Sequence, residues 1–136
     1  MTSTRSLCLL ALLAMLWSPP SQALVPPLSP PELLRKAHFV VTGTIVSIYE
    51  RSVSVAEGTN REYVASVAVQ GVDQGAGLGP GDLLYVHYWR AEQRPAGWVG
   101  DFGQSDLPRA GQKVRLYLTR RFKFYQLLNP NGWRPL

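Results

Sequence analysis

Two long segments rich in β-branched residues, at 39–55 and 61–72, constrain the fold more than any other feature of the chain. β-Branched side chains fit the pleated surface of a sheet, and the turn-forming residues at 56–60 separate the two segments. The pattern therefore predicts a long β-hairpin. Gly43 and Gly71 fall inside its strands, where a glycine often marks a bulge or a sharp bend.

Three further strands are predicted at residues 82–90, 111–120 and 121–128, each bounded by turn signals. The short links favour consecutive antiparallel neighbours. We therefore expect a mainly β fold: a five-stranded antiparallel Greek-key barrel of the oligonucleotide/oligosaccharide-binding (OB) type, preceded by a short helix. A small open sandwich is the alternative.

Side chains in a strand alternate between its two faces, and this predicts which residues of 111–120 reach the core. The inward set is Val114, Leu116 and Leu118, and the outward set is Lys113, Arg115, Tyr117 and Thr119.

The predicted helix covers residues 32–37. Ser29, followed by two prolines and Glu32, has the form of a capping box, in which the hydroxyl accepts a hydrogen bond from an unpaired amide of the first turn. Leu33 and Leu34 are expected to point toward the core.

Residues 1–23 have the pattern of a secretory signal peptide: Arg5, an apolar run at 7–16, and small residues at Ser21 and Ala23 before a cleavage site. A membrane anchor is the alternative, but the apolar run is short of the ~20 residues that span a bilayer. The expected organisation is a signal peptide, a proline-rich extended segment at 24–31, and one domain at 32–136. The expected location is secreted or periplasmic, with no stable membrane span after cleavage.

Cys8 is the only cysteine, and it lies inside the predicted signal peptide. The processed chain would therefore contain no thiol, which excludes disulfides, thiolate metal sites and cysteine nucleophiles from it. Such a domain must be held together by its hydrophobic core.

The chain carries a formal net charge of +5, and no acidic residue follows Asp106. A basic C-terminal third attracts anionic partners such as nucleic acid, acidic glycan or anionic lipid, although it is also compatible with a solvated surface that aids solubility. The basic residues beyond Asp106 are Arg109, Lys113, Arg115, Arg120, Arg121, Lys123 and Arg134.

Known catalytic and metal-binding motifs are missing from the sequence. His38 and His87 are far apart and form no zinc motif, and no serine has the setting of a nucleophile elbow. Asp101 and Asp106 could share a metal ion or a proton, although aspartates beside glycine are more often turn-formers. The glycine-rich segment 73–81 lacks the spacing of a phosphate loop. We therefore expect neither enzymatic activity nor a cofactor nor a bound metal.

The segment 85–90 combines three aromatic residues with a histidine and an arginine. Strand alternation puts Tyr85, His87 and Trp89 on one face, and arginines beside rings are what OB barrels use to stack bases or sugars. Side chains from a neighbouring strand and from the long loop at 90–111 are expected to join this face, although the rings could equally form an ordinary barrel wall. The candidate binding residues are Tyr85, His87, Trp89, Trp98, Arg115, Tyr117 and Arg121.

Residues 31–48, 62–75 and 111–120 resemble, in order and in apolar pattern, the netrin-like module of tissue inhibitors of metalloproteinases. The chain also looks similar to small secreted bacterial proteins, in which an ending like residues 128–136 recurs. The resemblance implies an OB-type fold, an extracellular setting and protein binding. The inhibitors of that family begin with a cysteine that binds the target's zinc. This chain has no cysteine at the corresponding place, so no inhibitory residue is carried over.

The expected function is therefore that of a secreted, non-enzymatic binding domain, which uses an aromatic and basic face to hold a protein or an anionic polymer. Three alternatives remain open at this stage. They are a nucleic-acid or glycan-binding OB protein, a structural or assembly component of the cell envelope with no soluble ligand, and a small hydrolase built on two carboxylates that the fold brings together.

Overall fold

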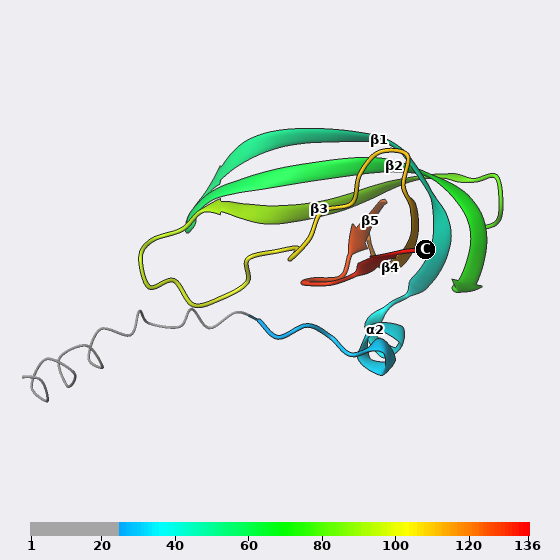
Figure 1. Ribbon diagram of the computed structural model, residues 1–136, viewed down its shortest axis with the longest axis horizontal. Helices are drawn as coiled ribbons and strands as arrows, with labels where there is room; N and C mark the ends of the chain where they lie inside the picture. Colours follow the sequence, from blue (N-terminus) through cyan, green and yellow to red (C-terminus); the bar gives the residue numbers. More distant parts are fainter. Residues whose placement is uncertain (1–24) are drawn as a thin grey trace, which may run out of the picture.

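The computed structural model describes residues 25–136, and in it six strands form one sheet with a short helix packed against it (Figure 1). The mainly β fold that the sequence predicts is confirmed. The elements are α2 (Pro30–Lys36), β1 (Phe39–Val55), β2 (Gly58–Gln74), β3 (Leu83–Gln93), β4 (Lys113–Arg121), β5 (Phe124–Leu127) and β6 (Trp133–Pro135).

The sheet closes into a ring because β1 has two neighbours. Its first residues, 39–44, pair with β4 on one side, while β2 pairs along the other side. The full order is β1-β2-β3-β5-β4-β6, with β1 also joined to β4. β3 and β5 run parallel, so the expectation that all neighbours are antiparallel is wrong at this pair. The long connection from β3 to β4 turns back along the end of β3, where Phe102 and Gln104 form backbone hydrogen bonds with Ala91 and Trp89. After β4, β5 runs beside β3 in the same direction.

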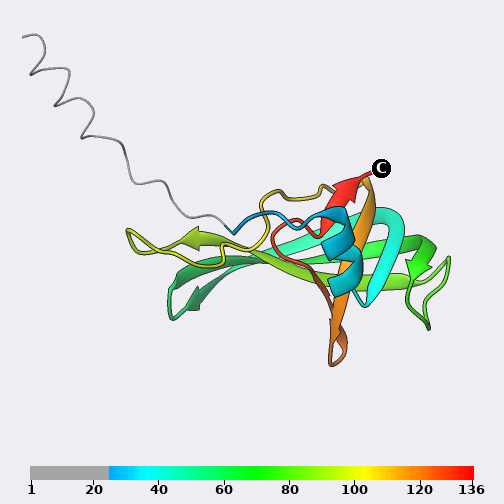
Figure 2. The same ribbon diagram turned by 90° about the horizontal axis from the view of Figure 1, so that it is seen from below.

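The predicted hairpin is present, with β1 covering residues 39–55 as expected and β2 running further at both ends. The register shifts beside Gly43, where a Cβ atom would overlap the carbonyl oxygen of Ala68. Only glycine permits this close approach of the two backbones. Beyond this region the hairpin continues outside the ring as a long arm, which Figure 2 shows projecting from the rest of the sheet.

The ring encloses the main core, to which β1, β2, β3, β4 and β5 all contribute apolar side chains. Val114, Leu116 and Leu118 are buried in it, as the alternation of their strand predicts. Tyr117 was expected to point outward into solvent, but it is only 3% exposed because it packs in a second apolar cluster beneath α2.

Ser29 caps α2, and its hydroxyl accepts a hydrogen bond from the amide of Glu32 at 3.4 Å. The helix begins at Pro30, two residues earlier than predicted, so the extended segment before it ends at Ser29. Leu33 is buried as expected. Leu34 is 47% exposed, which contradicts the prediction, because one short helix presents a single narrow face to the sheet.

Both ends of the described chain are fastened near each other. The side chain of Asn131 accepts a hydrogen bond from the amide of Leu28 and donates one to its carbonyl oxygen, both at 2.9 Å. The C-terminal residues form β6, which pairs with β4 and was not predicted, because three residues that include a proline carry little strand signal. The predicted signal peptide lies outside the described residues. No helix within residues 25–136 is long and apolar enough to cross a membrane.

Candidate binding groove

A groove of about 370 Å³ lies between the arm of the β1–β2 hairpin, β3 and the hairpin that joins β4 to β5. We call it the aromatic groove. Its lining consists mainly of ring-bearing and charged side chains, namely Tyr49, Arg51, Glu62, Tyr63, Val64, His87, Tyr88, Trp89, Arg121, Phe122, Phe124 and Gln126.

Strand register brings six of these residues into two adjacent rows. In the first row, Tyr49 lies opposite Val64, and Val64 lies opposite His87. In the second row, the residues in order across the three strands are Arg51, Glu62 and Trp89. Because directly opposite residues share a face of the sheet, the rows form a continuous surface of rings and charges.

The β4–β5 hairpin supplies the opposite side of the groove. The ring of Phe124 meets the His87 ring edge-on, with centroids 4.7 Å apart. Phe122 stands at the tip of the hairpin with φ of 56° and is 92% exposed. A phenylalanine in this left-handed conformation is unfavourable, and full exposure of its ring to water adds to the cost. Arg121 precedes it, so a guanidinium and two rings lie in sequence along this rim.

The groove carries more positive than negative charge. Arg51 forms an ion pair with Glu62 at 3.4 Å, whereas Arg121 has no ion pair with any residue between 25 and 136. Burial lowers the pKa of His87 below its ordinary value, and the nearby carboxylate of Glu62 opposes this shift only in part. His87 is therefore neutral at pH 7, and the excess charge comes from arginine.

The structure brings together three of the seven candidate binding residues, because His87, Trp89 and Arg121 all line the aromatic groove. Tyr85 is 57% exposed and lies on the same face of β3, one row further along, opposite Ser66 and outside the groove lining.

Trp98 lies apart from the groove lining, on the connection that follows β3. Its ring centroid is 5.7 Å from the guanidinium of Arg94, which also lies 5.9 Å from the Trp89 ring. Arg94 thus joins the start of the long connection to the end of β3. The indole nitrogen of Trp98 is buried and makes no hydrogen bond to the described residues.

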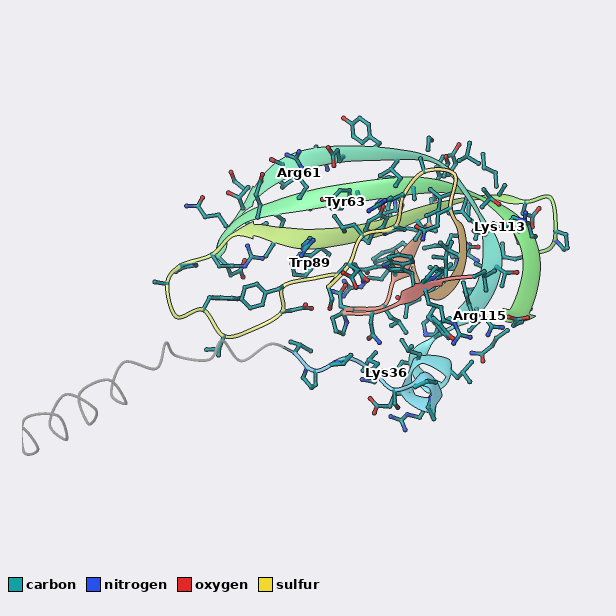
Figure 3. All side chains as sticks on the ribbon, in the orientation of Figure 1. Lys36, Arg61, Tyr63, Trp89, Lys113 and Arg115 are labelled. Atoms are coloured by element: carbon teal, nitrogen blue, oxygen red, sulfur yellow. The ribbon has the colours of Figure 1, made fainter. Side chains whose placement is uncertain are left out.

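Arg115 and Tyr117 lie on the same outward side of β4 as Arg121, but they do not reach the aromatic groove, contrary to expectation. β5 lies between β3 and β4, so β4 is not the neighbour of β3. Arg115 forms an ion pair with Asp73, and Figure 3 shows it at the end of the molecule away from Trp89. Tyr117 is buried beneath α2.

Tyr49, Phe122 and Phe124 line the groove but were not predicted as site residues. Each lies in a segment whose strand character the sequence does indicate. The hairpin of β1 and β2 that brings in Tyr49 was predicted, but the convergence of Phe122 and Phe124 with it depends on the pairing of β3 with β5, which joins residues far apart in sequence. The only local signal was the sequence around Phe122, where two aromatic residues alternate with basic ones.

The carboxylate of Asp101 has a structural role in the loop, whereas the contact at Asp106 is made by its backbone. One carboxylate oxygen of Asp101 accepts a hydrogen bond from the amide of Gly103 at 2.8 Å, and the other accepts from the side-chain amide of Asn129 at 3.1 Å. The backbone carbonyl of Asp106 accepts from the indole of Trp133. Within residues 25–136 no three potential metal ligands of the His, Cys, Asp or Glu type lie close enough together to hold a metal ion.

Comparisons with protein-family models, with curated proteins and with solved structures found no match to this chain.

Proposed function

We propose that this protein is a non-enzymatic binding domain whose aromatic groove holds one strand of an anionic polymer. The polymer consists of flat units, either bases or sugar rings, on which aromatic side chains can stack. The observation that carries the proposal is the convergence of Trp89 and His87 from β3 with Arg121 and Phe122 from the β4–β5 hairpin on one groove. Rings stack against flat units at ~1–3 kcal/mol each, and arginine neutralises the charged backbone between them.

The strand arrangement supports this proposal. A ring in which β1 joins β2 and β4, and β3 runs parallel to β5, has the connectivity we expect of an OB-type barrel. In such barrels the face of the second and third strands binds oligonucleotides or oligosaccharides, between the loop joining strands one and two and the loop joining strands four and five. The aromatic groove occupies the corresponding place here. An extracytoplasmic location remains part of the proposal, on the strength of residues 1–23.

The charge balance favours an anionic strand over a neutral one. Arg120 and Lys123 flank the tip of the β4–β5 hairpin, beside Arg121 and Phe122. None of these three cations forms an ion pair within the described part of the chain. A polymer that binds there would release condensed counterions, so its affinity should fall steeply with salt.

The test is a titration of the protein with two fluorescent probes, a single-stranded oligothymidylate and a sulfated oligosaccharide, at about 50 mM and about 200 mM salt. We expect at least one probe to bind, with an affinity that falls as salt rises. Arg121→Gln should weaken binding and reduce the salt slope by about 1. Phe122→Asn should weaken binding by about 5- to 100-fold, because it removes a stacking ring.

Arg134→Gln is the matched control, since it removes the same charge from β6, outside the groove lining. If Arg134→Gln reduces affinity as much as Arg121→Gln does, binding reflects net charge and the groove assignment is wrong. Preference for one probe identifies the polymer class. If neither probe binds at low salt, the proposal fails.

A protein partner is the second candidate, and the 92% exposure of Phe122 is the observation in its favour. A fully exposed ring on a hairpin tip can insert into a pocket of another protein, where buried aromatic residues dominate binding energy. Complex formation that depends on Phe122 but varies little with salt would favour this candidate over the anionic polymer.

A further inference from the structure

Among residues 25–136, no strand pairs with the outer edge of β1 over more than half of its length. β4 pairs with β1 only from Phe39 to Thr44, and Ile45 completes the contact through backbone hydrogen bonds to Gly111 and Gln112. From residue 46 to residue 55, β1 pairs only with β2, and its other edge forms no backbone hydrogen bond to the described chain. Figure 1 shows this stretch as the free margin of the three-stranded arm.

Natural proteins usually protect such an edge with lysines, prolines, short strands or strong twist. The segment 46–55 contains neither lysine nor proline. Its two charged residues are each neutralised within the chain, Glu50 by Arg61 at 3.3 Å and Arg51 by Glu62 at 3.4 Å. A bulge beside Val46 interrupts the start of this edge. Most of the remaining side chains are valine, isoleucine or tyrosine, which favour strands, and the others are serine.

We propose that a second copy of this chain covers the edge, with the two β1 strands paired antiparallel about a twofold axis perpendicular to the sheet. The edge suits itself as a partner because each copy offers the same row of free amide and carbonyl groups. Pairing would join the two three-stranded arms into one continuous sheet of six strands. This inference does not depend on the proposed ligand of the aromatic groove.

The symmetry restricts the register. Directly opposite residues in an antiparallel pair point to the same face of the sheet, so their residue numbers must differ by an even number. The twofold axis therefore lies at a position where one residue is directly opposite its own copy in the partner, and we name the axis by that residue. With an axis at Tyr49 or earlier, the end of the partner's β1 would overlap Gly111 and Gln112, which already form backbone hydrogen bonds with the edge of β1 at Ile45. Axes at Glu50 or Arg51 would put like charges directly opposite each other, which is unfavourable.

An axis at Ser52 avoids both problems. It puts Glu50 opposite the partner's Ser54, Arg51 opposite the partner's Val53, and Tyr49 opposite the partner's Val55. The last of these combines an aromatic with a β-branched side chain, which is a favourable cross-strand pair.

Single-cysteine cross-linking tests this register. In protein carrying Cys8→Ser, an introduced cysteine is the only thiol. Ser52→Cys should form an intermolecular disulfide under mild oxidation, because opposite Cβ atoms in a sheet lie about 4.5–5.5 Å apart. Ser54→Cys should not, since its two copies would be offset by about 13 Å along the strands. Equal cross-linking at both positions, or at Ser54 alone, would show that the register is wrong.

Sedimentation equilibrium tests the dimer itself. We expect a reversible monomer–dimer equilibrium at about 10–200 μM protein. Val53→Lys should raise the dissociation constant about tenfold or more, because it puts lysine opposite Arg51 at two symmetric places. Val53→Thr retains a β-branched side chain of the same size and should change the constant little. Val53 does not line the aromatic groove, so both variants should keep its ligand affinity.

A protein that stays monomeric throughout this range overturns the proposal. A dimer that is equally stable with Val53→Lys also overturns it, because another surface would then form the contact. Circular dichroism and thermal unfolding confirm that each variant is folded before its assembly is compared.

Discussion

At the scale of single residues, the aromatic groove depends on a few side chains held in unfavourable settings. His87 is partly buried between Val64 on β2 and the ring of Phe124 on β5. Phe122 adopts a left-handed backbone conformation at the tip of the β4–β5 hairpin. Such local costs often coincide with sites that contact a ligand, and here both residues line the same groove.

The pKa of His87 makes folding stability depend on pH. Because burial lowers this pKa below 6.5 in the folded state, the unfolded chain binds the proton more tightly. The stability that neutral His87 contributes is complete above about pH 6.5 and is lost as pH falls through the folded-state pKa. When the pH is lowered from about 7.5 to about 5.5, the free energy of unfolding of the His87→Gln variant should therefore fall by less than that of the unmodified protein.

Urea unfolding curves at the two pH values measure this difference. The comparison is made on the change in unfolding free energy with pH, so that any constant effect of the substitution cancels. The same pH dependence in both proteins would show that His87 does not titrate differently on folding.

At the scale of elements, one arginine fastens the first part of the long connection between β3 and β4 to the hairpin arm. Arg94 donates hydrogen bonds to the carbonyl oxygen of Thr59 at 3.2 Å and to the side-chain oxygen of Asn60 at 2.5 Å, both at the start of β2. Its guanidinium also lies near the rings of Trp89 and Trp98. The first part of the connection is therefore anchored to the hairpin arm rather than free in solution.

Arg94→Lys should release this part of the connection. Lysine cannot reproduce the forked hydrogen bonds of a guanidinium or its planar contact with two rings. Amide hydrogen exchange in residues 94–100 should become about tenfold faster, while exchange in the ring strands stays unchanged. Arg90→Lys is the control, because the Arg90 side chain is exposed and makes no hydrogen bond or ion pair that the described structure contains. Equal acceleration by both substitutions would contradict the anchoring role.

At the scale of the whole molecule, closure of the sheet places β4 between β1 and β5, and apolar side chains from these three strands pack together in the core. Leu118 on β4 lies opposite Phe39 of β1 on one side and Leu127 of β5 on the other, and it is fully buried. Removing its side chain leaves a cavity that the closed ring cannot easily collapse, because each strand is held by two neighbours. The ring should therefore unfold as one cooperative unit.

Leu118→Ala should lower the free energy of unfolding by ~2–5 kcal/mol. Leu83→Ala makes the same chemical change at a position that is 51% exposed, and it should cost less than ~1 kcal/mol. Chemical unfolding followed by both circular dichroism and tryptophan fluorescence gives the two values. Similar losses for both variants would mean that the core does not lie where the ring encloses it.

The sequence alone determined the features that depend on neighbours along the chain. Residues 39–55 alternate and branch as a strand does, and β1 has those bounds in the structure. The alternation in β3 correctly separated the buried Leu84, Val86 and Tyr88 from the opposite face. The cap at Ser29 correctly located the start of a helix to within two residues. These signals are local, because they arise from side-chain periodicity and from hydrogen bonds over a few residues.

The tertiary structure decided which strands are neighbours, and with them the composition of the groove. β5 lies between β3 and β4, so that β4, which carries Arg115, is not a direct neighbour of the aromatic residues of β3. This placement also brings Phe124 onto His87. Burial of Tyr117 depends on α2 folding back over β4, across more than 80 residues of chain. Such contacts follow from which pairing of distant segments buries the most apolar surface, and no local pattern in the chain encodes that choice.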